Sequence, residues 1–173
     1  DEPDAPTSWR WSIDIARAWE RALEEAATPR TRKVAMRTAM VMSSAPGGAY
    51  AVLRRLARAG LGGPIASGGQ YVSWIHEHDF VRAVTFLLER SDLAGPVNLA
   101  APEPLPQREF MAILREPFGV PVGLPMPAWL AELGAFFLRT ETELVLKSRR
   151  VVPGRLLGAG FAFRFRRWRE AAG

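Results

Sequence analysis

The order of apolar patterns along the first hundred residues constrains the fold most strongly. Apolar residues recur at intervals of three and four in three segments, which indicates amphipathic helices. Between these segments lie short apolar runs that are typical of strands. The predicted helices cover about Ser8–Ala27, Ala49–Gly60 and Phe80–Arg90, and the predicted strands cover Lys33–Met42, Tyr71–His76 and Gly95–Ala100. Because helices and strands alternate, we expect an α/β layer fold with parallel strands.

The chain changes character after this region. Seven prolines lie between Ala101 and Pro127, and one helix is predicted among them, at Gln107–Arg115. A second, apolar helix is expected at Pro127–Arg139, with a proline at its start. We therefore expect two parts, an α/β part over residues 1–120 and a small, mostly helical part over residues 121–173.

Composition narrows the classes of partner. The chain has 173 residues and no cysteine, which excludes disulfides and thiolate zinc sites. Its net charge is +5, and only Lys33 and Lys147 among the 23 basic residues are lysines. The arginines are scattered, mostly on the polar sides of helical patterns, so we expect no nucleic-acid partner. No apolar run reaches the roughly 18 residues of a membrane span, so we expect no membrane partner and a cytoplasmic location.

The stretch His76-Glu77-His78-Asp79 is the strongest candidate for chemistry. Two histidines and a carboxylate could hold a metal, but the helical HExxH spacing is absent, and we expect no metal. His76 could act as a general base, yet none of the nearby serines lies in a GxSxG turn. The remaining reading is a joint between a strand and a helix. There, Asp79 is predicted to cap the helix, and a half-buried His76 is predicted to bond to the backbone.

Two further stretches have weaker chemical signals. The loop Leu61–Gln70 is rich in glycine, but it matches neither GxGxxG at the start of a helix nor a P-loop. Near the C-terminus, "FRFRRWRE" mixes aromatic residues and arginines that could stack on bases. The alternation in "FAFRF" is more simply explained by a half-buried strand, and "RRWREAA" by a last helical turn.

Several stretches read together resemble one protein family. They are "ARAWERA" (16–22), "MRTAMVM" (36–42), "GLGGPIASGGQYVSWIHEHDFVRAV" (60–84), "GPVNLAAPEPLPQREF" (95–110), "PMPAWL" (125–130) and "RRVVPGRLLGAGFAFRF" (149–165). In this order they resemble the atypical short-chain dehydrogenase/reductase epimerase family, often labelled NAD-dependent epimerase/dehydratase or nucleoside-diphosphate-sugar epimerase. The last part resembles that family's C-terminal domain of unknown function.

The resemblance implies the C-terminal half of an extended Rossmann-type reductase, which has a doubly wound parallel sheet. Residues 1–120 would form a partial Rossmann-type domain without its N-terminal coenzyme-binding half, and residues 121–173 a substrate-side domain. Family members open with a GxxGxxG-type loop for the coenzyme pyrophosphate and carry a Ser and Tyr region for proton transfer. We expect both to be missing here. The full-length parent would use NADP or NAD, whereas we expect no cofactor and no catalytic residue in this chain alone.

The resemblance also assigns site residues. Val41 matches a position whose backbone contacts the coenzyme, and Arg37 begins the same stretch. The substrate cleft is expected to be bordered by Met42, Ser43, Gln70, Trp74 and His76.

Two departures from the family pattern bear on the substrate. Met40 stands where sugar-nucleotide epimerases have a substrate-binding Asn, and Val72 stands where they have a diphosphate-binding Arg. We therefore expect a small-molecule substrate without a diphosphate. The predicted function is that of a fragment of an NAD(P)-dependent oxidoreductase or epimerase. The alternative is a non-catalytic interaction module that pairs with a separate N-terminal half or with another copy of itself.

Overall fold

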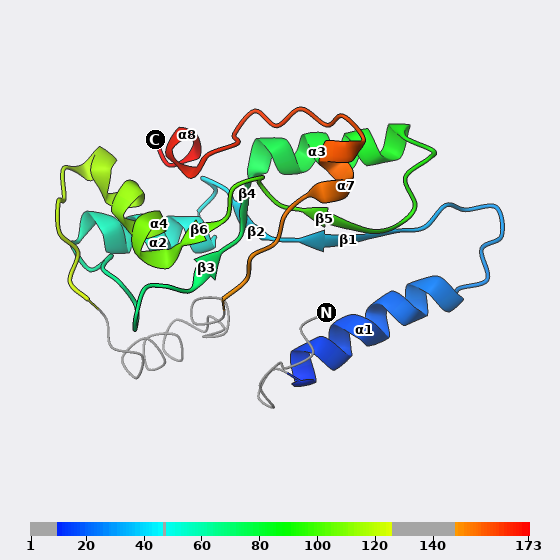
Figure 1. Ribbon diagram of the computed structural model, residues 1–173, viewed down its shortest axis with the longest axis horizontal. Helices are drawn as coiled ribbons and strands as arrows, with labels where there is room; N and C mark the ends of the chain where they lie inside the picture. The colour runs from blue at the N-terminus through cyan, green and yellow to red at the C-terminus, as the bar shows by residue number, and fades with distance from the viewer. Residues whose placement is uncertain (1–9, 47, 126–147) are drawn as a thin grey trace.

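The computed structural model describes residues 10–46, 48–125 and 148–173 (Figure 1). The helices are α1 (Arg10–Glu25), α2 (Ala49–Arg58), α3 (Glu77–Glu89), α4 (Gln107–Arg115), the 3₁₀ helix η2 (Glu116–Phe118), α7 (Gly154–Gly158) and α8 (Trp168–Ala171). The strands are β1 (Val34–Thr38), β2 (Met40–Met42), β3 (Tyr71–Val72), β4 (Trp74–His76), β5 (Gly95–Leu99) and β6 (Leu105–Pro106). The helix expected at Pro127–Arg139 lies outside the described residues.

The longer strands pair in parallel, which confirms the α/β prediction. β1 pairs with β5, from Val34 opposite Gly95 to Thr38 opposite Leu99. β2 pairs with β4, with Met42 opposite His76. Parallel strands need crossover connections, and the helices between these segments provide them.

The two parallel pairs meet at Ala39, which lies between the end of β1 and the start of β2. The Ala39 N–H donates to the Leu99 carbonyl at 3.0 Å, and the next residue, Met40, donates to the Ser73 carbonyl at 3.4 Å. Beyond this point the Ala101 N–H donates to the Trp74 carbonyl at 2.6 Å. β4 therefore enters between β2 and the segment that follows β5.

The stretch predicted as a single strand over residues 71–76 changes partner at Ser73. β3 pairs antiparallel with β6, whereas β4 pairs parallel with β2. The Ser73 hydroxyl donates to the Arg149 carbonyl at 2.6 Å and accepts the Val151 N–H at 2.8 Å. The C-terminal segment thus crosses the chain at the point where the two strands separate.

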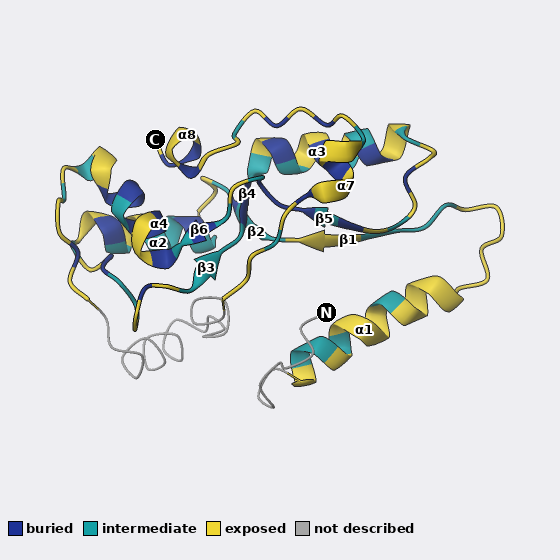
Figure 2. Ribbon diagram, viewed as in Figure 1, coloured by how far each residue is buried: buried dark blue, intermediate teal, exposed yellow. Residues whose placement is uncertain are grey.

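Two apolar cores lie on either side of β4 (Figure 2). Trp74 belongs to one core and its neighbour Ile75 to the other, because successive side chains of a strand point to opposite faces. The first core includes Met42, Tyr50, Phe110, Leu114 and Trp168. The second includes Leu87, Val97, Leu99, Leu156, Phe161 and Phe163. The described C-terminal residues therefore contribute to both cores.

The predicted strand in "FAFRF" is wrong in its hydrogen bonding but right in its burial. Phe161 and Phe163 are buried while Ala162 and Arg164 are exposed, as alternation predicts. The segment is nevertheless not part of any strand in the described residues. The predicted last helical turn is confirmed as α8.

Helix α1 and strand β1 present an uncovered apolar surface. Figure 1 shows α3 and α7 on one side of β1 and β5, and α1 on the other. No residue of α1 is buried, and Trp11 and Trp19 are 72% and 74% exposed. Met36 on β1 is 47% exposed, although the sequence predicts a buried strand there. In the described part of the chain, β1 pairs with β5 and with no second strand.

Candidate functional site

The carboxyl ends of β2 and β4 form the candidate site. Met42 and His76, the last residues of the two strands, are paired in register. The loop after Met42 and the first turn of α3 therefore meet at one edge of the sheet. In open α/β folds this edge is where ligands bind.

Glu77 holds the loop that follows β2. The Ser43 hydroxyl donates to one carboxylate oxygen of Glu77, and the Ser44 hydroxyl donates to the other at 3.1 Å. The Ala45 N–H in turn donates to the Ser43 hydroxyl at 3.2 Å. The Ser43 hydrogen bond, which stabilises the charged carboxylate, lowers the pKa of Glu77. The carboxylate is thus ionised and already engaged by two hydroxyls.

His76 is half-buried, and its ring is fixed on two sides. Its Nδ1 accepts the backbone N–H of His78 at 3.1 Å, which makes His76 the N-cap of α3. Its ring stacks on Phe165, with 3.9 Å between the ring centroids and 23° between the planes. Burial lowers the pKa of His76 because it disfavours the charged imidazolium. The sequence-based reading of a half-buried histidine that bonds to the backbone is confirmed.

The predicted helix cap at Asp79 is wrong. α3 begins at Glu77, three residues earlier than this cap requires, because the His76 ring takes the capping position. Asp79 is instead fully buried. Its carboxylate accepts the N–H groups of Arg164 at 3.0 Å and Phe165 at 2.8 Å, and it is 3.0 Å from Nη1 of Arg82. Asp79 thus anchors the C-terminal segment to α3.

The two residues predicted to contact the coenzyme lie apart from this cluster. The Val41 side chain packs against the second core, and its backbone pairs with Ile75. Arg37 extends toward α1 and forms two hydrogen bonds to Glu20, at 2.6 and 2.7 Å. This contact raises the pKa of Arg37 and lowers that of Glu20. Their roles with a coenzyme stay predictions.

The five residues predicted to border the cleft lie in three places. Ser43 and His76 lie at the edge described above. Met42 and Trp74 are fully buried in the first core, where the Trp74 Nε1 donates to the Glu103 carbonyl at 3.3 Å. Gln70 lies in the loop before β3 and donates to the Ile65 carbonyl at 3.1 Å. The structure therefore brings together two of the five at the sheet edge.

The glycine-rich loop serves packing in this structure. It leads into β3 rather than into a helix, so it lacks the arrangement that holds a dinucleotide pyrophosphate. A Cβ on Gly63 would overlap the Leu124 carbonyl, and a Cβ on Gly123 would overlap Gly62. The Leu124 N–H donates to the Gly60 carbonyl at 2.8 Å. The backbone of the glycine-rich loop is therefore in direct contact with the backbone at Gly123 and Leu124. This loop therefore does not fit the coenzyme pyrophosphate.

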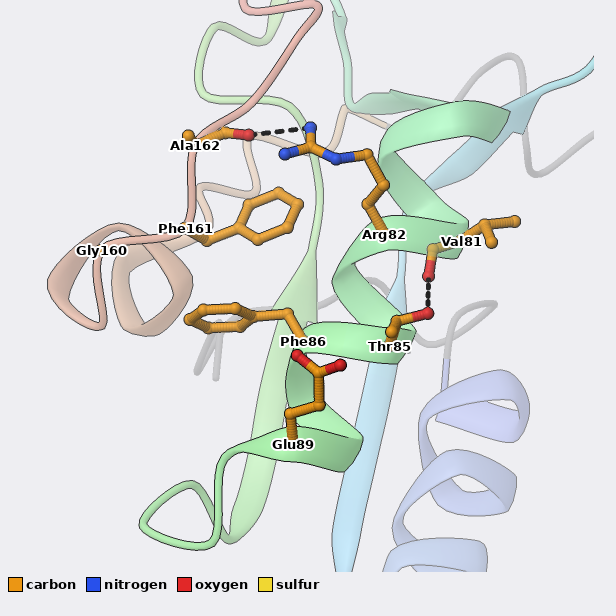
Figure 3. A pocket seen from close by; sticks show the side chains of 8 residues that line it. All are labelled: Val81, Arg82, Thr85, Phe86, Glu89, Gly160, Phe161 and Ala162. Carbon is orange, nitrogen blue, oxygen red and sulfur yellow. Dashed lines mark hydrogen bonds between the residues drawn. The ribbon is translucent and has the colours of Figure 1, made fainter.

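A shallow groove of about 430 Å³ lies between α3 and residues 160–162 (Figure 3). The Arg82 guanidinium spans it, lying 5.3 Å from the Phe161 ring centroid and donating to the Ala162 carbonyl at 2.9 Å. Phe86 meets Phe161 edge to face at 5.3 Å. These contacts engage the Arg82 guanidinium and both aromatic rings, and we interpret the groove as a packing seam between α3 and the C-terminal segment.

In the described residues, no group of three or more His, Cys, Asp or Glu side chains is placed to hold a metal ion. No helix in residues 10–46, 48–125 and 148–173 is long and apolar enough to cross a membrane.

Sequence reasoning missed two members of the site, Glu77 as a partner of the serines and Phe165 as a partner of His76. Glu77 follows His76 directly, but nothing local in the sequence connects it to Ser43, 34 residues away. The signal that could have found Phe165 is the alternation in "FAFRF". It indicates that an aromatic side chain of this segment turns toward the protein.

Comparisons with known proteins give these features a context. Residues 126–173 match the family described as "Domain of unknown function (DUF1731)". An epimerase family protein of Mycobacterium bovis is 38% identical over 157 residues, which cover 90% of this chain and 50% of that protein. The chain spans about half the length of the curated relatives it matches.

Two solved structures share the fold. The human epimerase family protein SDR39U1 (isoform 2), solved with NADPH, has a TM-score of 0.81 and 30% identity, with 92% of this chain and 52% of that chain covered. A nucleoside-diphosphate sugar epimerase of Corynebacterium glutamicum has a TM-score of 0.68 and 26% identity, with 92% and 29% covered. The predicted relationship to the epimerase family, with its C-terminal domain of unknown function, is confirmed, as is the Rossmann-like α/β fold.

Proposed function

We propose a function from the premise that this chain is the C-terminal part of an NAD(P)-dependent epimerase-like protein. In the longer protein, the chain forms the substrate-side wall of the active site. The reaction is a redox or epimerase reaction on a small molecule. The observation that carries this proposal is the meeting of Ser43, His76 and Glu77 at the carboxyl ends of two parallel strands.

The coenzyme would be bound mainly by the other half of the longer protein. NADPH is present in the human relative's structure, and we extend this ligand to the parent of the present chain. The coenzyme would supply or accept a hydride. The described residues offer no pyrophosphate cradle, so we propose that the chain alone binds NADPH weakly or not at all.

The substrate is proposed to lack a diphosphate. Val72, at the position of the family's phosphate-binding Arg, is paired with Leu105 and packs against the first core. Met40, at the position of the substrate-binding Asn, packs against the same core. Neither side chain offers a hydrogen bond to a charged oxygen, which is the contact a diphosphate requires.

The uncovered surface of α1 and β1 supports the proposed partner. Trp11, Trp19 and Met36 are each about half exposed or more, and exposed apolar surface combined with an unpaired strand edge favours association. We propose that the N-terminal half of the longer protein covers this surface. The alternative function, a non-catalytic module that self-associates, would use the same surface for a second copy.

The test is to supply an N-terminal half in trans and to measure NADPH binding by titration calorimetry. The corresponding half of the Mycobacterium bovis relative is suitable for this purpose. We expect no low-micromolar binding by the chain alone and clear binding by the mixture. The replacement Trp19→Ser should weaken NADPH binding by the mixture of the two halves. Leu88→Ser is a matched control, because Leu88 is also 74% exposed and belongs to α3, which Figure 1 shows on the opposite side of β1 and β5 from α1.

The proposed function and the alternative of an interaction module predict different results. Low-micromolar binding of NADPH by the chain alone would show that this half carries a coenzyme site, against the proposal. Binding of a second copy in light scattering, weakened by Trp19→Ser but with no response to the N-terminal half, would favour the interaction module instead.

A further inference from the structure

We infer that His76 is a neutral hydrogen-bond donor that presents its Nε2–H to a carbonyl oxygen of the small-molecule ligand. This assignment rests on the proposed function, because it concerns the same edge of the sheet. It adds the role of one side chain and the class of ligand atom that the side chain recognises. No proton is transferred in this role.

The tautomer of His76 follows from its hydrogen bond. The His78 backbone N–H points at Nδ1 from 3.1 Å, so Nδ1 must offer a lone pair. In a neutral imidazole the other nitrogen then carries the hydrogen. The proton of neutral His76 is therefore on Nε2.

The Nε2–H is available to a ligand. No described group forms a hydrogen bond with it, and in the described residues the buried side-chain nitrogen or oxygen left without a partner is Nε of Arg115. Since Nε2 of His76 is not such a buried atom, it reaches the surface of the protein. The Phe165 ring, stacked at 3.9 Å, restricts the imidazole without using this hydrogen.

The surrounding charges favour a neutral ligand atom over an anion. Three charged groups interact with His76, namely Glu77 and Asp79 on α3 and Arg164 on the C-terminal segment, and a fourth, Arg82, is paired with Asp79. Two of these four are acidic and two are basic, so they provide no net positive charge, and His78, also beside the ring, contributes to lowering the pKa of His76. A single N–H donor beside an aromatic ring matches one carbonyl oxygen on a small, largely apolar molecule.

Conversion of His76 to the imidazolium would oppose this arrangement. A proton on Nδ1 would face the His78 N–H and break the helix cap. The cap and the stack together therefore keep the ring neutral at the edge where a ligand binds. A neutral imidazole near a helix N-terminus polarises a carbonyl in triosephosphate isomerase, so the chemistry is feasible.

Nitrogen-15 NMR of the imidazole rings in the 173-residue chain tests the first part. We expect His76 to show the Nε2–H tautomer at pH 7, with Nδ1 as the unprotonated nitrogen. The resonances of His78, the other histidine, are identified because they disappear in the His78→Asn variant. An Nδ1–H tautomer or an imidazolium for His76 at this pH would overturn the inference.

Titration with two probes tests the ligand class. Cyclohexanone offers a neutral carbonyl, and cyclohexanecarboxylate offers an anion of similar size. We expect cyclohexanone to shift the His76 Nε2–H resonance and to bind about tenfold more weakly to His76→Asn, since asparagine keeps a cap acceptor but lacks this donor. His78→Asn should bind it like the unmodified chain.

Two other results of this titration would refute the proposed role of His76. Equal binding of cyclohexanone by His76→Asn would remove His76 from recognition, and stronger binding of the carboxylate would replace the carbonyl with an anion. Either result refutes this inference and leaves the NADPH titration with the N-terminal half unaffected. A failed NADPH titration with intact carbonyl recognition would instead refute the proposed function.

Discussion

Replacement of Asp79 should release the C-terminal segment from α3. Its carboxylate is fully buried and accepts two backbone N–H groups, from Arg164 and Phe165. Hydrogen bonds to a charged group contribute about 1.5–3 kcal/mol each. The ion pair with Arg82 adds less, because that side chain is 42% exposed and can be solvated. We expect Asp79→Ala to lower the free energy of unfolding by about 3–5 kcal/mol.

A second variant, Asp79→Asn, should lower the free energy of unfolding by a smaller amount. The asparagine oxygen can accept one N–H, but its NH₂ group faces the other, so we expect a loss of about 2–3 kcal/mol. Urea unfolding followed by tryptophan fluorescence measures both variants, and hydrogen exchange of the Arg164 and Phe165 amides locates the change. Asp92→Ala is the control, because the Arg90–Asp92 ion pair is exposed and should contribute no measurable stability. An Asp79→Ala chain as stable as the unmodified one, with both amides still protected, would refute the reasoning.

Three further variants test other parts of the structure by urea unfolding. Gly63→Ala should lose about 1–3 kcal/mol because its Cβ would overlap the Leu124 carbonyl, whereas Gly154→Ala, with open space at its Cβ, should lose nothing. Trp168→Ala removes a fully buried indole and should cost about 3–5 kcal/mol. Burial lowers the pKa of His76 from its ordinary 6.5, so the unfolded chain binds this proton more readily than the folded chain does. The free energy of unfolding should therefore fall as the pH drops through and below 6.5, and His76→Asn should lose this dependence.

Local patterns were sufficient for elements whose boundaries depend on nearby residues. The helix predicted at Gln107–Arg115 has those bounds in the structure, and the strand predicted at Gly95–Ala100 ends one residue earlier, at Leu99. In both cases the flanking prolines or glycine and the apolar spacing act within a few residues. The parallel pairing also followed from the order of elements, since a crossover helix separates the strands.

Local patterns failed where a distant segment decides the outcome. Asp79 has the residue type and position of a helix cap, but its partners lie 85 and 86 residues away. The strand predicted in "FAFRF" shows the alternate burial of a strand, yet a strand also needs a neighbour for its N–H groups. Two of those groups are taken by the Asp79 carboxylate, which the sequence could not reveal.

The cleft residues named from the resemblance are brought together only in part. Ser43 and His76 lie at one edge of the sheet because β2 and β4 pair in parallel. Trp74 was expected to border the same cleft from the resemblance to the epimerase family. The structure buries Trp74 against Trp168, with 5.0 Å between ring centroids. The packing of the C-terminal helix therefore decides which strand residues are available to a ligand.

The geometry of His76 thus depends on a contact that lies outside the sheet. Asp79 holds the backbone of Phe165 at 2.8 Å, and the Phe165 ring in turn covers one face of the imidazole. The same residue that stabilises the C-terminal segment consequently sets the burial of His76, which lowers the pKa of that histidine and keeps it neutral. The C-terminal segment therefore also shapes the edge that we propose binds the ligand. Changes in the C-terminal segment would then alter recognition without touching either strand.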